Sequence, residues 1–120
     1  MQAKELISTS IIVINLKHDG NTILAFMEEF KTAHLPVIDN NQYIGLISER
    51  EILDWDDTTD LINKHIYNLA SPSVNTEQHL FDVLKVMDEN ELSLVPVINH
   101  NQEYIGSISN INFIYLYSQL

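Results

Sequence analysis

The sequence contains no cysteine among its 120 residues, which excludes disulfide bonds and thiolate chemistry. Basic residues are also few, since 6 Lys and Arg stand against 17 Asp and Glu, for a net charge of −11. A nucleic-acid surface needs clustered Lys and Arg to neutralise phosphates, so the composition argues against DNA and RNA as partners. The absence of cysteine fits a cytoplasmic protein, and we expect that location.

Long apolar runs are missing as well. The longest runs, such as Ile11–Ile14, fall far short of the ~20 residues that a membrane span requires. The first ten residues lack the apolar core and cleavage site of a signal peptide. Hydrophobic residues nevertheless make up 45% of the chain, and no polar tract interrupts them. We therefore expect a globular protein with no membrane segment.

Features of known catalytic sites are absent too. The chain has 3 glycines in all, so it has no glycine-rich phosphate loop, and it has no Gly-x-Ser-x-Gly motif. Its histidines show no spacing typical of metal ligands. We therefore predict that the protein is not an enzyme and has no metal site.

The most informative feature is an internal duplication. The segment from Ala33 to Ile52 returns from Ser93 to Phe113, with one extra residue near Glu103. Ten of the 17 aligned positions from Leu35 to Glu51 are identical, against about one expected by chance. We assign repeat 1 to residues 1–62 and repeat 2 to residues 63–120.

Each repeat predicts the same order of elements. An apolar stripe predicts a helix over residues 21–33, and a second stripe predicts its counterpart around Phe81 to Met87, with Thr76 as N-cap. Leading strands are expected at residues 11–15 and 72–75.

Pro36 and Pro96 are expected to end these helices and begin short strands. Asn-containing turns then lead to a second strand in each repeat. Ser48 and Glu51 have the spacing of a capping box at the start of a further helix.

The duplicated pattern of helix, Leu-Pro-Val-Ile-Asp, polar turn, Tyr-Ile-Gly-Leu-Ile-Ser and helix resembles the cystathionine-beta-synthase (CBS) domain pair. The resemblance runs from about Leu6 to Leu116. It implies an α+β fold of tandem CBS repeats, each a small three-stranded sheet with helices on one face, packed as a pseudo-twofold pair. In this family the pair often forms a homodimer, and clefts between the repeats bind adenosine-containing ligands. The resemblance thus implies regulation rather than catalysis.

The family's ribose-phosphate motif is Gly, two apolar residues, Ser or Thr, two free positions and Asp. It maps onto Gly45, Ser48 and Glu51 in repeat 1, and onto Gly106, Ser109 and Asn112 in repeat 2. Neither copy keeps the aspartate, because Glu51 is one methylene longer and Asn112 has no charge. The resemblance therefore implies two degraded sites, of which the second is the weaker.

The resemblance also implies a phosphate contact and an adenine contact. Repeat 1 has His34 where the family often has a basic residue facing phosphate, whereas repeat 2 has Leu94. Adenine is expected against the leading strands, near Ser10, Ile11 and Ile12 in repeat 1 and near Ser73 and Val74 in repeat 2.

Each of these residues also has a purely structural interpretation. Ser48 and Glu51 can form a capping box alone, the two glycines can serve close packing, and His34 can be a surface residue at a helix end. Aromatic residues in Phe113–Tyr117 are expected in the core or a dimer interface.

Two functions therefore remain. The first is a regulatory module that binds AMP, ADP, ATP or S-adenosylmethionine, with Mg²⁺ needed only beside a polyphosphate. The second is a ligand-free dimerising scaffold. The chain could also be part of a longer protein, since no effector domain is visible in it.

Overall fold

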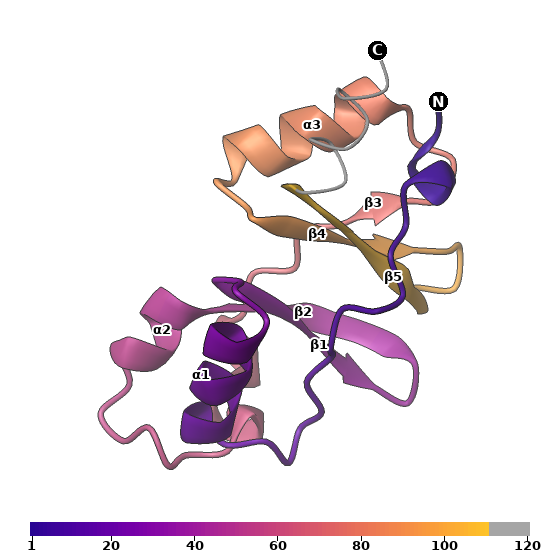
Figure 1. The fold of residues 1–120 in the computed structure, drawn as a ribbon. Helices are drawn as coiled ribbons and strands as arrows, with labels where there is room; N and C mark the ends of the chain where they lie inside the picture. Colours follow the sequence, from indigo (N-terminus) through magenta and orange to yellow (C-terminus); the bar gives the residue numbers. More distant parts are fainter. Residues whose placement is uncertain (111–120) are drawn as a thin grey trace. The chain divides into compact units, whose positions relative to one another are not determined.

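The computed structural model describes residues 1–110, which form an α+β fold (Figure 1). The elements follow one another in this order: the 3-10 helix η1 (Ala3–Glu5), α1 (Gly20–Glu29), β1 (His34–Asp39), β2 (Gln42–Ser48), α2 (Glu49–Leu53), the 3-10 helix η2 (Ile62–Asn68), β3 (Val74–Asn75), α3 (Leu80–Glu89), β4 (Leu94–Ile98) and β5 (Tyr104–Ser109). No helix within residues 1–110 is long and apolar enough to cross a membrane.

The chain divides into two compact units. The continuous unit consists of residues Ile12–Ser71. The composite unit combines Met1–Ile11, which we call the arm, with the described residues from Pro72 onward. These boundaries differ from those of the sequence repeats, because the arm belongs to repeat 1 and contacts the elements of repeat 2.

Helix α1 of the continuous unit begins behind Asp19, whose Oδ1 accepts a hydrogen bond of 2.7 Å from the Thr22 N–H. The helix buries Ile23 and Met27, as the apolar stripe predicted. It ends at Glu29 rather than at residue 33, because Lys31 adopts a left-handed backbone with φ of 55°. The expectation that Pro36 ends this helix was wrong, since Pro36 lies inside β1.

Strands β1 and β2 form an antiparallel hairpin whose turn carries Asn40 and Asn41 at φ of 49° and 68°. Asparagine tolerates this left-handed conformation, so the predicted turn is confirmed. The register shifts between Val37 and Ile38, which pair with Gly45 and Tyr43. Ile44 is therefore the extra residue of a β-bulge.

The leading strand of the continuous unit is reduced to one bridge. Ile14 pairs in parallel with Val37, and its N–H donates to the Pro36 carbonyl at 2.8 Å. Strand pairing stops there because the Asn15 N–H donates to Nδ1 of His18 at 3.1 Å. A local turn thus replaces the longer strand that was expected at residues 11–15. The sheet of this unit has two strands, β1 and β2.

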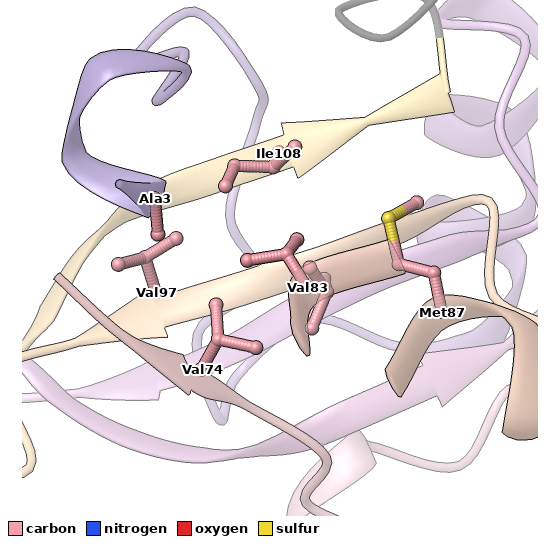
Figure 2. Close-up of a cluster of buried hydrophobic side chains, with 7 residues drawn as sticks. Ala3, Val74, Val83, Met87, Val97 and Ile108 are labelled. Atoms are coloured by element: carbon pink, nitrogen blue, oxygen red, sulfur yellow. The ribbon is translucent and has the colours of Figure 1, made fainter. Parts of the chain in front are cut away.

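The composite unit has the expected three-stranded sheet, in the order β3-β4-β5. Strand β4 pairs in parallel with β3 and antiparallel with β5, and Pro96 lies within β4 rather than at its start. Its core is a cluster of small and medium apolar side chains from the arm, the sheet and α3 (Figure 2). The members labelled there are Ala3, Val74, Val83, Met87, Val97 and Ile108.

Helix α3 begins one turn later than the sequence predicted. Its N-cap is His79, whose Nδ1 accepts a hydrogen bond of 3.1 Å from the Phe81 N–H. Thr76 was expected in this role, but its carbonyl accepts from the Lys4 N–H of the arm at 2.9 Å. Residues 76–78 therefore pair with the arm instead of starting the helix. The prediction of Thr76 as N-cap was wrong.

The two units use equivalent segments in the same way. In the composite unit Ser8 forms an isolated bridge with Ser107 of β5, and Figure 1 shows the arm passing across that strand. In the continuous unit the Leu46 N–H of β2 donates to the Ala70 carbonyl at 3.0 Å. The segment that leads one repeat thus packs on the sheet of the other repeat.

Candidate functional site

The residues that the sequence singled out in repeat 1 meet at one corner of the continuous unit. His34 is the first residue of β1 and pairs with Ser48, the last residue of β2. Helix α2 starts directly after Ser48, and the Glu49 N–H donates to the Ala33 carbonyl at 2.9 Å. Glu51 follows within the first turn of α2. The fold therefore brings His34, Ser48 and Glu51 together, and we call them the α2 corner.

The predicted capping box at this corner is confirmed. The Ser48 Oγ accepts from the Glu51 N–H at 3.1 Å. The Ser48 N–H and hydroxyl in turn donate to Oε1 of Glu51, at 3.2 and 3.0 Å. Both of these bonds converge on one carboxylate oxygen, and no residue among 1–110 donates to Oε2. Glu51 therefore keeps one oxygen that a ligand hydroxyl could approach.

The half-buried imidazole of His34 has a lowered pKa. Burial lowers it, because a charged ring loses hydration, and the nearby carboxylate of Glu51 raises it in part. Burial is the larger effect, so the pKa lies below the usual value of about 6.5. At neutral pH the ring is therefore mainly uncharged. An incoming phosphate would raise this pKa and draw a proton onto the ring.

Gly45 and Gly106 sit where a chain segment crosses the sheet closely. A Cβ on Gly45 would lie 2.8 Å from the Leu69 Cβ and 2.9 Å from the Ala70 carbonyl oxygen. A Cβ on Gly106 would meet the Ile7 side chain and would lie 2.9 Å from the Ser8 carbonyl oxygen. Close packing is therefore sufficient to require glycine at both positions, which agrees with the structural interpretation of these glycines from the sequence.

The equivalent corner of repeat 2 has different chemistry. Ser109 pairs with Leu94, a buried apolar residue, where repeat 1 pairs Ser48 with His34. Asn112 lies outside the described residues. Within residues 1–110, this corner has neither the imidazole nor the carboxylate of the α2 corner.

A part-buried polar pair in β5 escaped the sequence analysis. Ser107 is fully buried where repeat 1 has Leu46, and its Oγ lies 2.7 Å from the Tyr104 hydroxyl. Burial raises the pKa of Tyr104 more than the hydrogen bond lowers it. A serine at a buried strand position, three residues after a tyrosine, was the signal that could have revealed the pair.

The residues expected near adenine are spread over both units. Ser10 and Ile11 end the arm, whereas Ile12 begins the continuous unit. Ser73 and Val74 line a polar cavity of about 270 Å³, together with Asn75, Gln78, Ile98, Asn99, His100 and Gln102. Val74 pairs with Val97 of β4, whereas Ser109 pairs with Leu94, three residues earlier on the same strand. At about 3.3 Å per residue, Val74 and Ser109 therefore lie roughly 10 Å apart along the strand direction.

The acidic segment after α2, residues 54–60, takes part in a cluster of side chains that the sequence analysis did not resolve, and we call this segment the junction. The Trp55 indole stacks on the His65 ring, with centroids 3.9 Å apart and planes at 10°. His65 Nε2 lies 3.0 Å from Asp60 Oδ2, and Lys64 Nζ lies 3.4 Å from the same oxygen. Trp55 also packs on Gly20, where a Cβ would lie 2.9 Å from the indole. The cluster therefore ties the junction to the start of α1.

The architecture of two similar α+β repeats defines the class of protein. The family model of the CBS domain matches the chain twice, over residues 3–57 and 59–118. The chain therefore belongs to the CBS domain family, as a tandem pair, and CBS domain pairs are regulatory modules.

Two curated relatives come from Methanocaldococcus jannaschii. The uncharacterized protein MJ1232 is 24% identical over 69% of this chain and 28% of the relative. The uncharacterized protein MJ0188 is 20% identical over 95% of this chain and 43% of the relative. The chain thus spans less than half the length of these curated relatives.

Solved structures share the fold over nearly the whole chain. The CBS domain pair/ACT domain protein TM0892 of Thermotoga maritima has a TM-score of 0.82 and 18% identity, covering 99% of this chain and 98% of that one. CBSX2, solved in complex with AMP, has a TM-score of 0.77 and 23% identity, covering 98% and 96%. At these identities the likeness concerns the fold.

Proposed function

We propose that this CBS pair is a regulatory module that senses an adenosine-containing ligand through the α2 corner of repeat 1. The observation that carries the proposal is the convergence of His34, Ser48 and Glu51 on one corner of the fold. Family membership and the AMP complex of CBSX2 support the choice of ligand class.

Each residue of the α2 corner has a distinct part in this proposal. His34 is half-buried and mainly neutral until a phosphate shifts its pKa upward, so it binds the phosphate as a cation without paying for a permanent buried charge. Oε2 of Glu51 accepts from a ribose hydroxyl. Ser48 already donates its N–H and hydroxyl to Oε1, so Oε2 is the carboxylate oxygen left for a ligand.

Charge favours a monophosphate over a triphosphate. The chain carries a net charge of −11, and triphosphates therefore approach it at a Coulombic cost that Mg²⁺ reduces. We accordingly rank AMP above ADP and place ATP with Mg²⁺ above ATP alone. S-adenosylmethionine, which has a cationic sulfur, is the member of this ligand class that needs no phosphate contact.

Three observations favour the second candidate function, a dimerising scaffold that binds no nucleotide. Ser48 and Glu51 satisfy each other, and close packing accounts for both glycines without any ligand. The continuous unit also exposes the apolar side chains Phe30 and Leu53, at 47% and 61%. We propose a homodimer for either function, which static light scattering tests by giving about twice the chain mass of 13.8 kDa.

Thermal unfolding with AMP, ADP, ATP with and without Mg²⁺, S-adenosylmethionine and NAD decides between the two functions. A ligand at 100 times its Kd should stabilise the fold by about 2.7 kcal/mol. The response should fall in His34→Gln and persist in Tyr67→Phe, which changes an exposed side chain outside both candidate sites. No stabilisation by any of these compounds would leave the scaffold as the function.

A further inference from the structure

The arm, Met1–Ile11, makes all its longer-range backbone hydrogen bonds with one partner surface. The Ala3 and Lys4 N–H groups donate to the carbonyls of Gln78 and Thr76 at 2.8 and 2.9 Å. The Leu80 N–H donates to the Met1 carbonyl at 2.9 Å. Ser8 and Ser107 exchange two bonds of 2.8 and 3.1 Å. Among residues 1–110, these are the backbone bonds that join the arm to the rest of the chain.

The side chains of the arm complete the core of the composite unit. Ala3 is fully buried, and Figure 2 shows its methyl group directed toward Val97. Leu6 and Ile7 pack against the same cluster, and Ile7 lies over Gly106 where no Cβ would fit. The surface thus accepts a segment with a small residue at one point and a branched residue over the glycine. The arm's own sequence has that pattern.

The connection between the arm and the continuous unit has few constraints of its own. Over residues 9–13 the backbone bond observed is that from the Ser10 N–H to the Ser8 Oγ, at 3.3 Å. Regular pairing resumes at Ile14, whose N–H donates to the Pro36 carbonyl. Five extended residues span up to about 17 Å. The backbone between Ser8 and Ile14 is therefore a suitable hinge.

We propose that the arm exchanges between two copies of this chain, so that the arm of one copy completes the composite unit of the other. Every contact described for the arm is reproduced when the same segment of a second copy occupies the surface. The form in which the arm docks on its own chain and the form in which it docks on a second copy then differ only in the conformation of the hinge. Exchange of the arm is therefore a low-cost route to a dimer. The match between the arm's sequence and the surface selects a second copy as the occupant.

The absence of cysteine allows a direct test with single engineered thiols in the full chain. Gln2 and His79 form an antiparallel bridge. The flanking bonds from Ala3 and Leu80 mark a non-hydrogen-bonded pair, whose Cα atoms lie about 4.5 Å apart, within disulfide range. Gln2→Cys and His79→Cys proteins are mixed, incubated and oxidised. We expect a heterodimer in which one Gln2→Cys chain and one His79→Cys chain are linked by a disulfide bond.

Thr9→Cys mixed with His79→Cys is the matched control, because Thr9 is on the same arm but does not face His79. Exchange predicts at least tenfold more heterodimer from the Gln2 mixture than from the Thr9 mixture. The double variant Gln2→Cys/His79→Cys should close within one chain and, once oxidised, should no longer exchange. Equal yields from both mixtures, while the double variant closes normally, would overturn the proposal.

Hydrogen exchange on the unmodified chain gives an independent result, which matters because His79 also caps α3. If the arm leaves the composite unit as one piece, the amides of Ala3, Lys4, Ser8 and Ser107 should all become exposed to solvent in the same opening event. Their amide hydrogens should then be replaced by deuterium with one common protection. That opening should be at least tenfold more frequent than the opening of the central strand β4. If the arm amides are as strongly protected from hydrogen exchange as those of β4, the proposal that the arm exchanges between copies is contradicted.

Discussion

Replacing Glu51 by aspartate separates the ligand-binding role of the α2 corner from its structural role. The shorter carboxylate withdraws from Ser48, so the bonds of 3.2 and 3.0 Å to Oε1 lengthen or break. Each neutral or charge-assisted bond of this kind contributes about 0.5–3 kcal/mol. The Glu51 N–H still donates to the Ser48 Oγ, because that bond does not use the altered side chain. We therefore expect a loss of about 1 kcal/mol in unfolding free energy, or roughly 4 °C in Tm.

The effect on ligand affinity should have the opposite sign. Aspartate is the residue that the CBS ribose motif has at this position, and the change also frees the Ser48 hydroxyl for a phosphate. Recovery of one charge-assisted bond with about 1.4 kcal/mol corresponds to about tenfold tighter binding of AMP. Isothermal titration calorimetry measures the affinity, and thermal unfolding without ligand measures the stability.

Glu49→Asp is the control for this experiment, since it shortens a neighbouring exposed carboxylate of the same helix turn. It should change neither Tm nor affinity appreciably. If Glu51→Asp lowers Tm and leaves the affinity for every adenosine ligand unchanged, Glu51 acts only as a cap. If it changes neither quantity, the described geometry of the corner is also wrong.

Other perturbations test further parts of the structure. Gly45→Ala should lower the unfolding free energy by about 1–3 kcal/mol, because its Cβ would press on the Ala70 carbonyl; an unchanged Tm would contradict the close crossing. His34 has a lowered pKa in the folded state, so the unfolded state binds more protons just below about pH 6.5. Its contribution to stability should be complete above that pH and lost as the pH falls through the lowered pKa, and His34→Gln should flatten this part of a denaturation profile. The affinity for AMP should rise as the pH falls through the same range in the wild type, because His34 becomes charged there, and it should not rise in His34→Gln.

Local patterns in the sequence predicted the features that depend on neighbouring residues. The capping box of Ser48 and Glu51 follows from a three-residue spacing, and the left-handed turn at Asn40 and Asn41 follows from the tolerance of asparagine for positive φ. The duplication predicted that both repeats would have the same hairpin, and the same β-bulge occurs at Ile44 and at Ile105.

Features that depend on distant residues could not be predicted in this way. Thr76 has the character of an N-cap, but its carbonyl pairs with Lys4 of the arm, more than seventy positions earlier. The crossing of Gly106 by Ile7 likewise joins residues that no local pattern connects. The family resemblance pointed to Ser48 and Glu51 as motif residues and to His34 as a separate phosphate contact, while their meeting at one corner and the lowered pKa of His34 required the structure.

Because the segment that leads each repeat packs on the sheet of the other repeat, the two units are completed at different times during synthesis. The continuous unit has all its residues once Ser71 has been made, so its hairpin can be covered by Leu69 and Ala70 early. The arm has no such early partner. Ser107 follows Ile11 by 96 residues, which at ribosomal rates corresponds to roughly 5–20 s. Ala3, Leu6 and Ile7 must therefore remain undocked until their partners between Val74 and Ile108 have been made, and during that time a chaperone or a neighbouring nascent chain has its best access to them.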